Sequence, residues 1–75
     1  MELSPRQINV LHGLALGLTN RQIAFALGIG HQTVKNHLTE LYDRLLPRRQ
    51  RNQQHRLLAV LEAMRQGMLD DIMRT

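Results

Sequence analysis

Apolar residues recur at intervals of three and four along four stretches of the chain, and glycine or proline separates the stretches. This spacing places the apolar side chains on one face of a helix, whereas a strand would alternate them with polar ones. The pattern predicts helices over about residues 5–16, 20–27 and 31–45, and a fourth helix that follows Asn52. No stretch alternates as a strand does, so the predicted fold class is all-α with four helices.

Capping residues mark the ends of these helices. Ser4 and Thr19 are each followed three residues later by a glutamine, which is the pattern of a capping box, and Pro5 suits the first helical position. Gly28 is expected to end the second helix in the left-handed conformation. Pro47 ends the third helix, because its ring and its missing N–H stop the run.

The second and third helices are separated by three residues, Gly28-Ile29-Gly30, and this arrangement is the layout of a helix-turn-helix unit. In such a unit the second helix of the pair enters the major groove of DNA with its N-terminal half. Val34 and Leu38 are expected to face the core. The polar residues that then face outward, toward docked DNA, are Gln32, Lys35, Asn36 and Thr39.

The charge is positive and unevenly distributed. Ten Lys and Arg stand against six Asp and Glu, a formal net charge of +4, and no acidic residue occurs from Leu3 to Thr39. A second acid-free segment contains five arginines, Arg44, Arg48, Arg49, Arg51 and Arg56. Such segments attract polyanions, of which nucleic acid is the commonest in a cell, although a solvated basic surface without a partner is the alternative. With one Phe, one Tyr and no Trp, the chain lacks the stacking platforms of a single-strand binder.

Length and composition exclude several classes of protein. A chain of 75 residues is one small domain and rarely forms both a core and a substrate cavity, and no catalytic set appears, so an enzyme is not expected. The chain has no cysteine, and its four histidines are too far apart in sequence for a local ligand pair, so neither a metal nor a cofactor is expected. No apolar run approaches the ~18–20 residues of a membrane span, and no signal peptide is present, which favours a cytoplasmic protein.

Three segments carry a family resemblance: Leu3-Ser4-Pro5-Arg6-Gln7, the string GLTNRQIA at 17–24, and TVKNHL at 33–38. Together they strongly resemble the LuxR-type (GerE-type) helix-turn-helix of bacterial transcription regulators, over about residues 3–61. The resemblance implies a four-helix domain, assigned here to residues 1–67, whose third helix reads the major groove. It also implies a homodimer on an inverted repeat of double-stranded DNA, often formed through the fourth helix. Residues 68–75 are then a tail, which extends the fourth helix if Gly67 does not end it.

The resemblance also suggests roles for individual residues. Lys35 matches a position that contacts bases or phosphate, and Asn36 and Thr39 match base-reading positions. Asn20 and Thr33 match phosphate-contacting positions. Arg21 adjoins Asn20, Gln32 belongs to the outward face of the third helix, and two arginines of the loop after that helix could reach phosphate. The candidate DNA-binding residues are therefore Asn20, Arg21, Gln32, Thr33, Lys35, Asn36, Thr39, Arg48 and Arg49.

The fourth helix carries an apolar stripe that is expected to pack on the core, formed by Leu57, Leu61, Met64 and Met68. A dimer needs a second face of the same helix. The candidate dimer interface is Val60, Ala63 and Met64.

The sequence departs from the family pattern in ways that leave alternatives open. Gly30 stands where the family has a Ser or Thr cap, and the loop after the third helix has one extra residue, so the orientation of the fourth helix is not fixed. Ile8, Leu16 and Phe25 stand at positions that are usually polar. They are either scattered surface residues or a surface that a partner or the tail covers. The alternatives to a DNA-binding regulator are an anti-regulator that binds a larger LuxR-type protein and an element that binds RNA polymerase.

Overall fold

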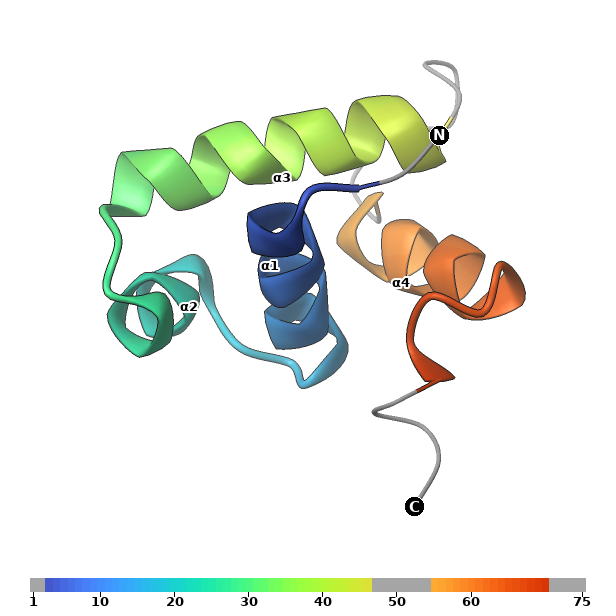
Figure 1. Cartoon of the computed structure of the whole chain (residues 1–75), viewed down its shortest axis with the longest axis horizontal. Helices are drawn as coiled ribbons and strands as arrows, with labels where there is room; N and C mark the ends of the chain where they lie inside the picture. The colour runs from blue at the N-terminus through green and yellow to red at the C-terminus, as the bar shows by residue number, and fades with distance from the viewer. Residues whose placement is uncertain (1–2, 47–54, 71–75) are drawn as a thin grey trace.

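The computed structural model describes residues 3–46 and 55–70. These residues form four helices, α1 (Pro5–Ala15), α2 (Asn20–Leu27), α3 (His31–Leu45) and α4 (His55–Arg65), and no strand occurs among them (Figure 1). The all-α class is confirmed. The bounds of α1, α2 and α3 agree with the prediction, except that α1 ends one residue earlier.

Local hydrogen bonds explain where α1 and α2 begin and end. The Ser4 and Thr19 side chains each accept a hydrogen bond from the backbone N–H three residues later, and Gln7 and Gln22 complete both capping boxes. Gly28 has φ +68° and caps α2 in the left-handed conformation, as predicted. Gly30, the N-cap of α3, supplies no side-chain hydrogen bond.

The end of α4 settles an alternative that the sequence left open. Gly67 has φ +77°, its N–H donates to the Met64 carbonyl at 3.0 Å, and the Met68 N–H donates to the Ala63 carbonyl at 2.9 Å. These bonds satisfy the last carbonyls of the helix, so α4 ends before Gly67. The predicted N-cap at Asn52 lies outside the described residues.

The helices pack around one core. In Figure 1, α1 lies at the centre with α2 and α4 on either side of it, and α3 crosses all three. Val10 and Leu11 of α1, Ile23 of α2, and Val34 and Leu41 of α3 are completely or almost completely buried. The crossing of α1 and α2 is close: a Cβ atom on Gly13 would lie 2.7 Å from Cγ1 of Ile23.

The inner and outer faces of α4 are the reverse of the prediction. Ala59 and Ala63 are fully buried in the core, whereas Leu57, Leu61 and Met64 are 55%, 50% and 40% exposed. The prediction of Ala63 as an interface residue is therefore wrong, as is the prediction of Leu57, Leu61 and Met64 as core residues. Small alanine side chains on the inner face let the helix backbone pack closely on its neighbours, and Leu58 and Val60 beside them are partly buried against the core.

Five further apolar residues are only partly buried or are exposed. Val60 and Met68 are partly buried and pack against the core. This agrees with the prediction for Met68. Val60, which was predicted to lie in the dimer interface, exposes only part of its side chain. Phe25 of α2 and Leu16, the C-cap of α1, are 90% and 64% exposed. Ile8 is half-buried.

Candidate nucleic-acid interface

The N-terminal half of α3 presents an uninterrupted polar face. Val34 and Leu38 are buried, as predicted, and hold the opposite side of the helix against the core. The five predicted DNA-binding residues of this helix are all exposed: Gln32, Thr33, Lys35, Asn36 and Thr39. This half of α3 can therefore meet a partner without any rearrangement of the core.

Hydrogen bonds within α3 orient two of these side chains. Gln32 Nε2 donates to Asn36 Oδ1 at 3.1 Å, which leaves the Asn36 amide N–H groups directed elsewhere. The Thr39 hydroxyl donates to the Lys35 carbonyl at 3.1 Å, so its oxygen and methyl group remain for a partner. Pairs four residues apart are neighbours on a helix surface and restrict each other's rotamers.

An acidic residue ends the polar face. Glu40 Oε1 accepts a hydrogen bond at 2.8 Å from Nε2 of Gln7, a buried residue of α1, and lies 3.6 Å from Nδ1 of His37. Glu40 is thereby fixed at the contact between α1 and α3, and its carboxylate would repel phosphate. The part of α3 suited to a polyanion therefore ends at Thr39.

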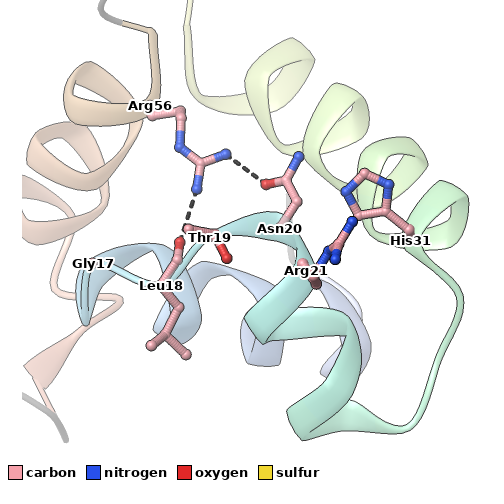
Figure 2. A pocket seen from close by; sticks show the side chains of 7 residues that line it. All are labelled: Gly17, Leu18, Thr19, Asn20, Arg21, His31 and Arg56. Carbon is pink, nitrogen blue, oxygen red and sulfur yellow. Dashed lines mark hydrogen bonds between the residues drawn. The ribbon is translucent and has the colours of Figure 1, made fainter.

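A wide, open hollow of about 690 Å³ lies beside the N-terminus of α2 (Figure 2). Its lining brings together three basic side chains that are far apart in the sequence, namely Arg21, His31 and Arg56. The first N–H groups of a helix lack partners within the helix, and the helix dipole adds partial positive charge there. An anion such as a phosphate group is the ligand that this combination favours.

Asn20, a predicted phosphate-contacting residue, lines the hollow, and a hydrogen bond holds its side chain there. It is the first residue of α2 and half-buried, and its Oδ1 accepts a hydrogen bond from Arg56 Nη1 at 2.6 Å. Arg56 Nη2 also donates to the Leu18 carbonyl at 3.0 Å. Arg56 belongs to the acid-free segment of the sequence, but no sequence pattern predicted its contact with Asn20, because 36 residues separate the two.

The Arg56 guanidinium also lies near Tyr42 of α3. Burial raises the pKa of the Tyr42 hydroxyl above its ordinary value, and the positive charge of Arg56 opposes this increase. The Arg56 side chain lies close enough to the hydroxyl to lower its pKa as a hydrogen-bond donor would, but no described residue meets the geometry of a full hydrogen bond with this buried oxygen. The Tyr42 ring packs on His55, with ring centroids 4.5 Å apart.

The structure thus gathers most of the predicted DNA-binding residues in two places. Asn20 and Arg21 line the hollow, and the polar face of α3 carries the rest, with His31 at the start of α3 between them. Arg48 and Arg49 lie outside the described residues. No group of His, Cys, Asp and Glu that could hold a metal ion occurs in residues 3–46 and 55–70. Within the same ranges no helix is long and apolar enough to cross a membrane.

A separate surface lies on α4. Leu57, Leu61 and Met64 follow one another at intervals of four and three and form one exposed stripe, here called the α4 apolar stripe. Nearby, Glu62 accepts hydrogen bonds from Arg65 and Gln66, which lower the pKa of its carboxyl group to about 2. Charged residues therefore border the stripe on the solvent side.

Comparison with known proteins gives results that agree with this geometry. The model of a family described as bacterial regulatory proteins, luxR family, matches residues 1–51. The nitrate/nitrite response regulator protein NarP of Escherichia coli (strain K12) is 51% identical over 43 residues, which are 57% of this chain and 20% of NarP. The transcriptional regulatory protein YdfI of Bacillus subtilis (strain 168) is 37% identical over 68 residues, which are 91% of this chain and 29% of YdfI. The chain thus spans less than a third of the length of these relatives. No solved structure matches the chain.

Proposed function

Because the chain belongs to the luxR family of bacterial regulatory proteins, a family of DNA-binding transcription regulators rather than enzymes, we propose that it binds duplex DNA with sequence preference through the N-terminal half of α3. The observation that carries this proposal is the exposed polar face from Gln32 to Thr39, which has no acidic residue. An α-helix with such a face fits the major groove, where base edges are distinguishable.

The side chains of this face suit different parts of the groove. Asn36 reads adenine by a bidentate contact with N6 and N7, and Gln32 restricts its orientation through their hydrogen bond. Lys35 binds guanine or a phosphate, and Thr39 contacts a neighbouring base with its oxygen or methyl group. Thr33, in the first turn of α3, lies where a phosphate would approach.

The hollow beside α2 supplies contacts that position the domain without reading sequence. Asn20 and Arg21 donate to a phosphate there, and the N-terminus of α2 adds backbone N–H groups. Phosphate contacts release counterions, so the affinity for any duplex should decrease steeply with salt concentration.

The α4 apolar stripe is the surface through which two copies associate on an inverted repeat. It replaces the interface predicted from sequence, since Ala63 is buried and Val60 packs against the core, while Met64 remains part of it. One recognition helix contacts few base pairs, and a two-fold dimer doubles these contacts and fixes the half-site spacing near one helical turn. Three half-exposed side chains form a small interface, so the dimer should be stable on DNA rather than free.

Selection from a random duplex library tests the proposal. The protein should enrich one sequence family, and Asn36→Ala should reduce the preference at a single base pair by about 1–3 kcal/mol. Asn9→Ala, at an exposed asparagine of α1, is the matched control and should leave the selected sequence unchanged. A wild type that enriches nothing would rule out sequence-specific binding.

A second function is favoured by the exposure of Phe25 and Leu16, which is unusual for large apolar side chains. In this alternative the domain is an interaction module that binds RNA polymerase or a larger LuxR-type regulator. A protein that enriches no duplex sequence and loses partner binding on Phe25→Ala would support it.

A further inference from the structure

The position of Arg56 has a consequence for how α2 approaches DNA. We infer that Arg56 is a positioning residue, which orients the Asn20 amide toward a bound phosphate and joins α4 to the DNA-contacting end of α2. The inference rests on the proposed function, because it concerns the same phosphate contact.

The hydrogen bonds of Arg56 fix the orientation of Asn20. The guanidinium group has only donors, so the Asn20 atom that faces it at 2.6 Å must be the oxygen. The amide nitrogen, with two N–H donors, then lies on the other side of the group, and in Figure 2 it points away from Arg56. An unrestrained asparagine would distribute its amide over several rotamers and would lose more entropy on binding a phosphate.

The second hydrogen bond makes the contact rigid. Arg56 Nη2 donates to the Leu18 carbonyl at 3.0 Å, so one planar group holds both the turn before α2 and its first residue. In Figure 1, α2 and α4 lie on opposite sides of α1, and the two Arg56 bonds connect them. Tyr42 of α3 is also close to the guanidinium, whose charge lowers the pKa of its hydroxyl.

The same geometry makes Arg56 unsuited to be the main phosphate ligand. Two of its terminal nitrogens already donate to protein acceptors, and the side chain is half-buried. Arg21, by contrast, is exposed at the edge of the hollow and has the charge to release a counterion. Substitution of Arg56 should therefore reduce the affinity for duplex DNA without removing an ionic contact to phosphate.

The test measures the duplex affinity of the chain between low and high salt for Arg56→Gln, Asn20→Ala and the double variant. Arg56→Gln should weaken binding about five- to tenfold at every salt concentration, the usual effect of one hydrogen bond. The slope of affinity against salt should stay the same, whereas loss of an ionic contact between Arg56 itself and a phosphate would reduce it by about 0.9. The double variant should bind no more weakly than either single variant, because the two residues act through one contact.

Arg65→Gln is the matched control, since it removes the same charge from an exposed position of α4 where the arginine pairs with Glu62. It should bind DNA like the wild type. Arg56→Gln binding equal to that of this control, a reduced salt slope, or additive losses in the double variant would each overturn the positioning role. A wild type that binds no duplex would overturn this role together with the proposed function.

A separate variant covers the case in which Arg56→Gln fails to fold. Asn20→Asp keeps an oxygen for Arg56 and places a carboxylate at the N-terminus of α2, which favours folding, but it removes the amide N–H donors. It should melt at or above the wild-type temperature and bind duplex more than tenfold more weakly. Unchanged affinity for this variant would overturn the inference.

Discussion

The outward faces of α3 and α4 differ in chemistry, although both helices pack on the same core. On α3 the core takes Val34, Leu38 and Leu41, and the solvent side is left with polar residues. On α4 the core takes Ala59 and Ala63, and the α4 apolar stripe is left in solvent. The first face can exchange hydrogen bonds with base edges and phosphates, whereas the second gains free energy only when another apolar surface covers it. One small domain therefore presents one polar and one apolar helix face to solvent.

The two helices also differ in what their buried residues contribute. Val34 and Leu41 are large and completely buried, so apolar side chains of α3 attach this helix to the core. Ala59 and Ala63 bury little apolar area each, and the partly buried Leu58 and Val60 and the hydrogen bonds of Arg56 add to the contacts of α4. α4 therefore buries fewer large apolar side chains completely than α3 does.

A glutamate introduced on the buried face of α4 should change the free energy of unfolding more than any other substitution considered for this domain, and a glutamate on the exposed face should change it little. Ala63→Glu places a carboxylate where no solvent reaches, and it should lower the free energy of unfolding by at least about 3 kcal/mol. Leu61→Glu, at a half-exposed position two residues earlier, should change it by less than about 0.5 kcal/mol in the monomer. Urea unfolding of both variants measures the difference. Equal losses would mean that the two faces are not as distinct as described.

Leu61→Glu should show its effect in assembly instead. With an inverted-repeat duplex, the variant should lose about 2 kcal/mol of dimer stability, because a charge enters an apolar contact at its centre. Phe25→Glu makes the same kind of change at an exposed apolar residue of α2 and should leave dimerisation unchanged. Sedimentation of each complex gives the number of protomers per duplex. Loss of the dimer in Phe25→Glu alone would move the interface to α2.

The same contrast explains which features were predictable from sequence. The starts of α1 and α2 depend on residues within three positions of each other, and both capping boxes were predicted correctly. The polar face of α3 also follows from one strong periodicity. The core face of α4 did not, because apolar residues surround this helix and only its neighbours decide which ones are buried. The contacts of Arg56 with Asn20 and of Gly13 with Ile23 join separate helices, so no local sequence pattern predicts them.

Substitutions in the turn before α3 should change the free energy of unfolding by an intermediate amount. They test the backbone conformation that sets the orientation of α3. Gly28 has φ +68° with no atom near its missing Cβ, so Gly28→Val should cost about 1–3 kcal/mol through backbone strain alone. Gly30, two residues later, has φ −73°, and a Cβ there would make only an ordinary van der Waals contact, 3.8 Å from Oγ1 of Thr33. Gly30→Ser should therefore gain a few tenths of a kcal/mol by capping α3. Thermal unfolding should show opposite signs, and a loss in both variants would contradict the assignment of strain to Gly28.

The smallest effect concerns Tyr42, which lies on the inner side of α3 facing α4. Its hydroxyl is buried without a partner among the described residues, so Tyr42→Phe should keep or raise the free energy of unfolding at neutral pH, by no more than about 1 kcal/mol. Burial raises the pKa of this group in the folded state, against the opposing charge of Arg56, and the folded state therefore favours the protonated hydroxyl. Its contribution to stability is fully present below the unfolded pKa, about 10, and is lost as pH rises through the higher folded value.

The wild type should consequently lose stability above about pH 10 more steeply than Tyr42→Phe does. Tyr42 is the one tyrosine of the chain, and every other group is the same in both proteins, so a difference between the two slopes belongs to this hydroxyl. Urea unfolding of both proteins at neutral and at strongly alkaline pH measures the difference between the two slopes. Parallel curves would show that the hydroxyl is solvated in the folded protein, and the contact of α4 with the inner side of α3 would then be looser than the packing of Ala59 and Ala63 implies.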